Sequence, residues 1–172
     1  MTMSNHLEHS FFNRPVLEVA EDLIGARLIK DGRELTITEL EAYDGPSDLA
    51  CHASKGCTER TRVMYGAAGV FYVYLCYGMY WMLNIVTGPA GYPAALLIRG
   101  AGDISGPGKL TKALGIDGSY NNRPADPKTG LYFTPPETRP HKKLIQTTPR
   151  IGVSYAGPVW ANKPYRYLLT AG

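Results

Sequence analysis

The sequence has few of the residues that build a disulfide framework or a metal site. Its three cysteines, Cys51, Cys57 and Cys76, are odd in number and form no CxxC pair, and its four histidines are scattered. Disulfide scaffolds and zinc sites need paired or clustered ligands, so neither is favoured. We expect a protein of the reducing cytoplasm that needs no metal or other cofactor.

Long apolar runs are also missing. Tyr, Gly and Asn interrupt every apolar stretch before it reaches the length of a membrane span. The N-terminus lacks the basic segment followed by an apolar one that marks a secretory signal. We therefore expect no membrane association. A net charge of +3 permits a polyanionic partner without requiring one.

The composition is that of a folded protein. With 172 residues, 44% hydrophobic and 19% charged, the chain can bury a substantial core, and extended disorder is not expected. We expect one domain spanning residues 1–172, preceded within that range by a flexible polar arm over residues 1–12.

Turn signals and periodicity predict an α+β fold. Pro15 opens an expected helix that ends at Gly25, and residues 105–109 introduce a second one that ends at Gly115. Asp31-Gly32 is a strong hairpin turn between strands expected at 26–30 and 33–43. Further strands are expected at residues 94–99, 131–133, 150–155 and 165–169. The sum is a single compact domain with a mainly antiparallel sheet and flanking helices.

Residues 71–84 predict a protruding aromatic β-hairpin. Six aromatic residues fall within the eleven positions 71–81, and Tyr72 and Tyr74 alternate with Val73 and Leu75, as in a strand with two different faces. Gly78-Met79 offers a reversal, which would present Tyr77 at the tip. The alternative is an ordinary aromatic core hairpin.

Two carboxylates share one expected strand. One face of this strand is expected to carry Leu35, Ile37, Glu39, Glu41 and Tyr43, just before a Gly-Pro turn. A pair of carboxylates is typical of glycoside hydrolases. However, residues two apart on one strand lie side by side and cannot easily flank a bond from opposite faces. One of them is the better candidate for chemistry.

Other polar residues are candidates too, and most of them have two readings. Arg99 closes an apolar strand, either as a surface cap or as a partner for Glu41 or Glu39. Asn84 follows two apolar residues, and a buried amide there needs hydrogen bonds. The run 105–110, which contains Lys109, is either a simple helix start or a phosphate-binding turn. Arg60 and Arg62 lie on a solvated loop, or contact phosphates.

Taken together, these segments resemble the alkyladenine (3-methyladenine) DNA glycosylase family. The order and approximate spacing hold from about residue 16 to residue 169, and the EAYxGPxD and YVYxxYGMYxxxN patterns are specific. The matching segments are 39–46, 50–52, 72–80, 84, 96–99, 105–110, 150–153, 156–157 and 163–164. The link 100–104 is shorter than the helical insertion of some family members.

The resemblance implies a monofunctional glycosylase that flips a damaged purine out of duplex DNA and hydrolyses its N-glycosidic bond. Glu41 would be the general base that deprotonates water, and Arg99 would help to hold that water. The implied base pocket consists of Tyr43, His52, Tyr74 and Asn84, with Asn84 placed to collide with the amine of normal guanine. Tyr77 would fill the gap in the duplex, and Arg60, Arg62 and Lys109 would contact the DNA backbone.

The physical chemistry agrees with these implied roles. Flipping costs a few kcal/mol, which a stacking tyrosine offsets, and cationic methylated purines are attracted to electron-rich rings. The expected partner is damaged double-stranded DNA, bound by a monomer. The alternative class is a nucleic-acid-binding module that uses the aromatic hairpin without chemistry. A carboxylate together with Asn84 and Arg99 argues against that alternative, since pure binding needs no carboxylate beside a polyanion.

Overall fold

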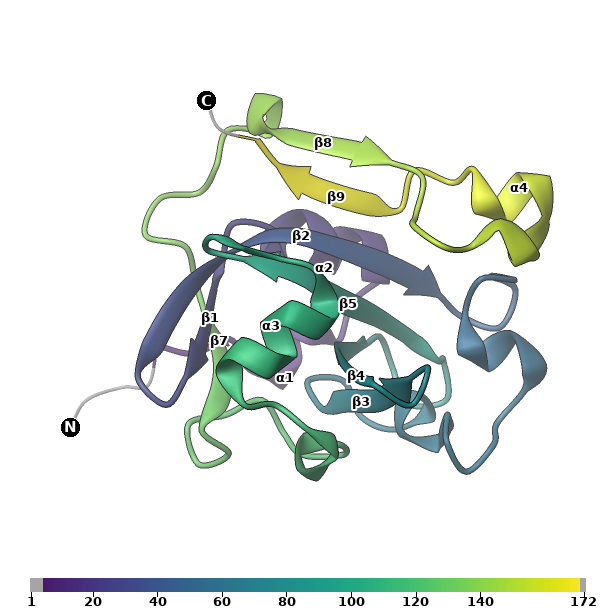
Figure 1. Cartoon of the computed structure of the whole chain (residues 1–172), viewed down its shortest axis with the longest axis horizontal. Helices are drawn as coiled ribbons and strands as arrows, with labels where there is room; N and C mark the ends of the chain where they lie inside the picture. The colour runs from purple at the N-terminus through teal and green to yellow at the C-terminus, as the bar shows by residue number, and fades with distance from the viewer. Residues whose placement is uncertain (1–4, 171–172) are drawn as a thin grey trace.

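The computed structural model describes residues 5–170, and its longest strand, β2 (Arg33–Asp44), organises an antiparallel sheet (Figure 1). The other strands are β1 (Arg27–Lys30), β3 (Phe71–Cys76), β4 (Tyr80–Thr87), β5 (Ala94–Ala101), β6 (Ile104–Ser105), β7 (Leu131–Thr134), β8 (Ile145–Thr148) and β9 (Arg166–Leu169). The helices are α1 (His9–Phe12), α2 (Val16–Leu23), α3 (Pro107–Leu114) and α4 (Gly157–Ala161). The predicted α+β class with a mainly antiparallel sheet is confirmed.

The strand order places the end of β2 at the centre of the sheet. The order is β3-β4-β5-β2-β1-β7, and β9 pairs with residues Glu39–Glu41 of β2 on the edge opposite β5. β8 extends the sheet beyond β9, so that the C-terminal segment lies along β2 (Figure 1). Glu39 and Glu41 therefore lie on a strand with partners on both sides.

Local signals explain most element boundaries. Asp31 and Gly32 both have positive φ (50° and 83°), as the two-residue turn between β1 and β2 requires. In α2 the buried positions are Val16, Val19, Ala20 and Leu23, the stripe that the sequence indicates. α3 begins at Pro107 and is capped by Gly115 in the left-handed region, with φ 67°.

The main core lies between the sheet and the helices. In Figure 1, α3 lies in front of β5 and α2 lies behind β2. Their apolar stripes belong to one cluster of buried residues that also contains side chains of β1 to β5 and β7. Within the described residues, none of the helices is long and apolar enough to cross a membrane.

Three expectations about local structure are wrong. The arm expected over residues 1–12 does not extend that far, because residues 9–12 form α1 and Phe12 is fully buried in the core; residues 1–4 lie outside the described range. The strand expected at 150–155 is instead a loop and a 3-10 helix, and the strand that pairs with β9 is β8. The backbone N–H of Ile151 donates to a carboxylate instead of a neighbouring strand.

The third difference concerns the faces of β2. A period of two would place Ile37 on the side of Glu39 and Glu41. However, Ile37 belongs to the main core together with Leu40, three residues further on. The register between β2 and β5 is irregular between Ile37 and Leu40, and such an irregularity interrupts the alternation of sides. The glutamates are thereby directed away from the main core.

Candidate active site

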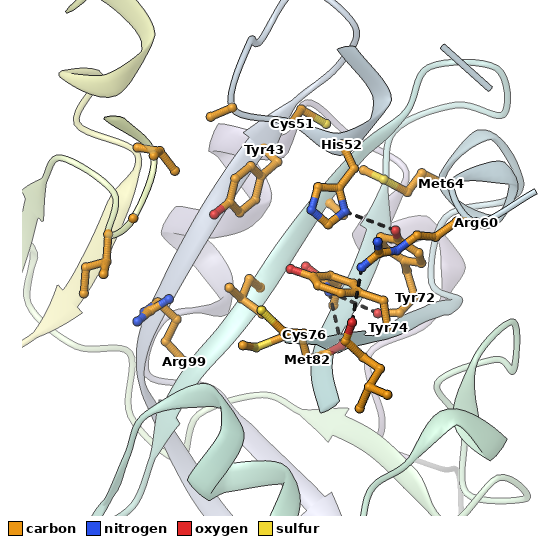
Figure 2. A pocket seen from close by; sticks show the side chains of 18 of the residues that line it. Tyr43, Cys51, His52, Arg60, Met64, Tyr72, Tyr74, Cys76, Met82 and Arg99 are labelled. Atoms are coloured by element: carbon orange, nitrogen blue, oxygen red, sulfur yellow. Dashed lines mark hydrogen bonds between the residues drawn. The ribbon is translucent and has the colours of Figure 1, made fainter. Parts of the chain in front are cut away.

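A cavity of about 470 Å³ lies beside the end of β2 and the aromatic strand β3. This volume is in the range that binds small organic groups. Figure 2 shows the rings of Tyr43, His52 and Tyr74 directed toward one space, with Arg99 at one edge and Arg60 at the other. The cavity therefore combines aromatic walls with cationic side chains at its edges.

The rings of the cavity support one another. His52 lies edge-on to Tyr74, with 4.6 Å between ring centres, and Tyr74 lies 5.3 Å from Tyr72. Nδ1 of His52 hydrogen bonds to the hydroxyl of Tyr72 at 3.2 Å. Because Tyr72 and Tyr74 are two residues apart on β3, the strand itself places both rings on the cavity side.

Glu41 lies behind the wall of this cavity and is fully buried. Its Oε1 accepts hydrogen bonds from the hydroxyl of Tyr43 (3.0 Å) and from Nη1 of Arg99 (3.4 Å). Its Oε2 accepts from the backbone N–H of Ile151 at 2.7 Å. All three donor residues line the cavity, whereas Glu41 is not among the described residues that do. A carboxylate has about four acceptor sites, so one remains for a further donor.

Arg99 connects the two carboxylates of β2. Its Nε donates to Oε2 of Glu39 at 3.2 Å, while its Nη1 reaches Glu41. Arg166 on β9 donates to the same oxygen of Glu39 at 2.7 Å. Of the two readings of Arg99, the structure therefore favours the carboxylate partner. Glu39 holds the guanidinium in place, and Arg99 presents the charge to Glu41.

Asn84 on β4 is buried and lines the cavity. Its amide nitrogen donates to the backbone oxygen of Tyr72 at 3.1 Å and to that of Met82 at 3.4 Å. A buried amide held by backbone carbonyls has a fixed orientation, so Asn84 forms a rigid part of the cavity wall.

Comparisons with known proteins bear on this arrangement. A family model described as Methylpurine-DNA glycosylase (MPG) matches residues 10–104 and 102–171. A Myxococcus xanthus protein named "Putative 3-methyladenine DNA glycosylase" is 45% identical over 175 residues, which cover 94% of this chain and 89% of its own length. A protein of the same name from Methanocella arvoryzae is 45% identical over 185 residues, covering 94% and 90%. A third, from Legionella pneumophila strain Corby, is 42% identical over 174 residues, covering 95% and 93%.

The chain belongs to the methylpurine-DNA glycosylase family. The resemblance noted in the sequence is thus confirmed at the level of the family. The match spans the cavity-bearing strands β2 to β5 and the C-terminal segment that covers Glu41.

In this member of the methylpurine-DNA glycosylase family, the structure brings together most of the side chains that we expect at the site. Tyr77 lies at the turn of the β3–β4 hairpin, is 90% exposed and lines the cavity edge. Arg60 also lines the cavity, with its guanidinium 4.9 Å from the centre of the Tyr74 ring. Arg62 and Lys109 are exposed and are not among the described residues that line the cavity. Their expected contacts with DNA stay predictions.

α3 clarifies the glycine-bearing run near Lys109. A Cβ on Gly108 would come within 2.7 Å of the Tyr80 ring. Gly106 is the N-cap, with φ 113°. The glycines thus serve the start of the helix and its close packing on β4, which favours the reading of the run as a simple helix start.

Burial sets the protonation of the groups in the site. Burial, and then the charge of Glu41, raises the pKa of the Tyr43 hydroxyl well above its usual value, so Tyr43 remains a donor. Burial, and then the cations of Arg60 and Lys55, lowers the pKa of His52, which is therefore neutral at neutral pH. Burial raises the pKa of the Cys51 thiol to about 12, so that it is not a thiolate.

The sequence reasoning missed several residues of the site. Tyr72 could have been found, since it lies two residues before Tyr74 on the same strand. Asp48 and Arg150 form a buried ion pair behind Tyr43. Asp48 ends the EAYxGPxD pattern and Arg150 begins a matching segment, but nothing local indicates that they pair, because they are 102 residues apart. Among the described residues, no group of three or more His, Cys, Asp and Glu side chains is arranged to hold a metal ion.

Proposed function

We propose that this protein is a DNA glycosylase that removes alkylated and deaminated purines from duplex DNA. The observation that carries the proposal is the buried carboxylate of Glu41, held by three donors at the wall of an aromatic cavity. Membership of the methylpurine-DNA glycosylase family and the names of the relatives support it.

In the proposed mechanism a damaged nucleotide rotates out of the duplex, and its base enters the cavity. Tyr77, exposed at the hairpin turn, replaces the lost stacking in the duplex. The rings of Tyr43, Tyr74 and His52 surround the base. For cationic purines such as 3-methyladenine, contact with desolvated rings is worth on the order of 1–2 kcal/mol.

The chemical step requires one water molecule. Glu41 accepts its proton as the water attacks the anomeric carbon, and the glycosidic electron pair leaves with the purine. Arg99 and the backbone near Ile151 line the cavity beside the carboxylate, so a water held there would reach its remaining acceptor site. The carboxylate also stabilises the positive charge that develops on the sugar.

The direct test measures free base. Pure protein is expected to release 7-methylguanine from methylated duplex DNA, as a monomer and in the presence of EDTA. DNA binding without base release would support the alternative of a nucleic-acid-binding module, and activity abolished by EDTA would contradict a metal-independent reaction.

Asn84 provides a test of selectivity. If its rigid amide collides with the 2-amino group of guanine, Asn84→Ser should increase the release of undamaged guanine while lesion excision continues. Release of guanine from unmodified DNA is the measurement. Background release equal to that of wild type, with lesion activity intact, would argue against this placement of Asn84.

The pH dependence should distinguish two kinds of lesion. A cationic 7-methylguanine leaves as a neutral purine and needs no acid, so its excision should not fall at higher pH. A neutral hypoxanthine gains from protonation and should give a bell. The pKa of His52 is lowered from its usual value near 6.5, so His52 loses its proton on the acidic side of neutrality. At neutral pH it has no acidic proton left to donate.

We therefore expect His52→Gln to keep the bell for hypoxanthine under single-turnover conditions. A falling limb that vanishes in His52→Gln would identify His52 as the acid instead. Identical bells for 7-methylguanine and hypoxanthine would remove the leaving-group argument itself.

A further inference from the structure

The ion pair of Asp48 and Arg150 is the most completely buried one that the structure describes, with neither side chain exposed. The guanidinium donates to both carboxylate oxygens of Asp48, at 2.6 and 3.0 Å. Asp48 also accepts the backbone N–H groups of Asp44 and Ala50, which fixes it within its loop. A buried charge pair with this many partners has one geometry, because any movement would leave a charge unpaired.

Arg150 attaches this pair to β2 next to Glu41. Its Nη1 donates to the backbone oxygen of Ala42 at 3.0 Å. Its guanidinium lies 5.0 Å from the ring centre of Tyr43 and 5.1 Å from that of Tyr165. The face of Tyr43 is thus supported by a fixed cation, and the hydroxyl of the same residue donates to Oε1 of Glu41.

Arg150 also fixes the other side of the carboxylate. Residues 150–153 form no strand, so no ladder of backbone hydrogen bonds determines where their N–H groups point. The side chain of Arg150 anchors this segment through Asp48 and through the backbone oxygen of Trp160. The next residue, Ile151, directs its N–H to Oε2 of Glu41 at 2.7 Å.

We propose that Asp48 and Arg150 are positioning residues for Glu41, which set two of its three hydrogen-bond donors through one buried ion pair. This inference rests on the proposed function. It assigns the pair no contact with DNA or with the reacting atoms. Its effect is on the chemical step, since a displaced general base loses rate even where the base pocket is intact.

The chosen variant is Arg150→Lys, which keeps the buried charge but loses the two-pronged contact with Asp48 and the flat contact with Tyr43. On duplex DNA with one 7-methylguanine, we expect the single-turnover rate to fall by about 10- to 100-fold, as for a base displaced by about 1 Å. Lesion-DNA affinity should stay within about threefold of wild type, because the cavity lining remains. Uncatalysed base loss is subtracted throughout.

A double-mutant cycle distinguishes positioning from loss of fold. If Arg150 acts through Glu41, Arg150→Lys should change the residual rate by less than about twofold once Glu41→Gln is present. An equal loss in both backgrounds would mean that Arg150 supports the fold alone. A loss of affinity as large as the loss of rate, or a rate unchanged by Arg150→Lys, would also overturn the proposal.

Two further variants complete the design. Asp48→Asn keeps the shape of the aspartate side chain and should show the same dependence on Glu41. The test therefore does not depend on whether Arg150→Lys folds. Asp22→Asn is the matched control, because Asp22 pairs with Arg14 and Arg139 and is not among the described residues that line the cavity. It should leave both rate and affinity unchanged. A wild-type protein that excises nothing would instead overturn the proposed function, and the positioning role with it.

Discussion

Glu41→Gln is expected to reduce the single-turnover rate of lesion excision by about 10²–10⁴-fold, the usual contribution of a general base. The amide keeps the shape of the side chain but cannot accept a proton from water. Binding of lesion-containing duplex should persist, because the rings that surround the base are unaltered. Rates measured with enzyme in excess over DNA check this, and a rate within tenfold of wild type would remove Glu41 from the role of base.

The hydrogen bonds of Glu41 add a consequence for stability. The side-chain amide that Glu41→Gln introduces must place its NH₂ opposite the Ile151 N–H or opposite Arg99, where a donor would face a donor. An unsatisfied buried donor costs about 1–3 kcal/mol, so thermal unfolding of the variant needs to be measured alongside its rate. A loss of rate that disappeared under conditions where all of the variant is folded would reflect stability, not chemistry.

Glu39→Gln is the matched control for the first prediction. Glu39 accepts from Arg99 and from Arg166 on one oxygen, and among the described hydrogen bonds it is connected to Glu41 only through Arg99. We expect a loss below about tenfold, limited to looser placement of Arg99, since the oxygen of an amide still accepts a hydrogen bond. A loss as large as that of Glu41→Gln would assign the chemistry to the pair.

Tyr77→Ala has the second largest expected effect. The side chain is 90% exposed at the turn of the β3–β4 hairpin and forms none of the described hydrogen bonds, so its removal leaves the core intact. Stacking of one aromatic ring on a base is worth about 1–3 kcal/mol, which corresponds to roughly 5- to 150-fold in the equilibrium for flipping. Fluorescence of a 2-aminopurine placed beside the lesion should report less flipping in duplex DNA.

Single-stranded DNA separates the wedge from the pocket. Such DNA has little stacking to replace, so Tyr77→Ala should reduce its excision far less than that of duplex DNA. Equal losses on both substrates would mean that Tyr77 acts in the pocket, whose edge it also lines.

Local sequence signals predicted the parts of the fold that local forces determine. The Asp31-Gly32 turn, the apolar stripe of α2 and the glycine cap of α3 each depend on residues within one or two turns of chain. Predictions were wrong where distant segments compete. Residues 150–155 have the apolar pattern of a strand, but the ion pair with Asp48 and the N–H of Ile151 engage them elsewhere.

The same distinction applies to the candidate site. The family pattern placed Tyr43, His52, Tyr74, Asn84 and Arg99 on one cavity, and the structure brings them there. It did not indicate that Glu41 is fully buried, since burial depends on the C-terminal segment more than 100 residues away. It gave no role to Arg150, because a contact across 102 residues leaves no spacing for a local pattern to detect.

The backbone at the hairpin turn places stability and activity in opposition. Tyr77 has φ 54°, in the left-handed region, where a residue with a side chain costs roughly 1–2 kcal/mol relative to glycine. The next residue, Gly78, occupies the same region without that penalty. Directed evolution for heat resistance alone would therefore favour glycine at position 77 and remove the ring proposed to enter DNA. Variants of this protein selected for thermal tolerance need to be screened on duplex substrates, because single-stranded ones would not reveal the loss.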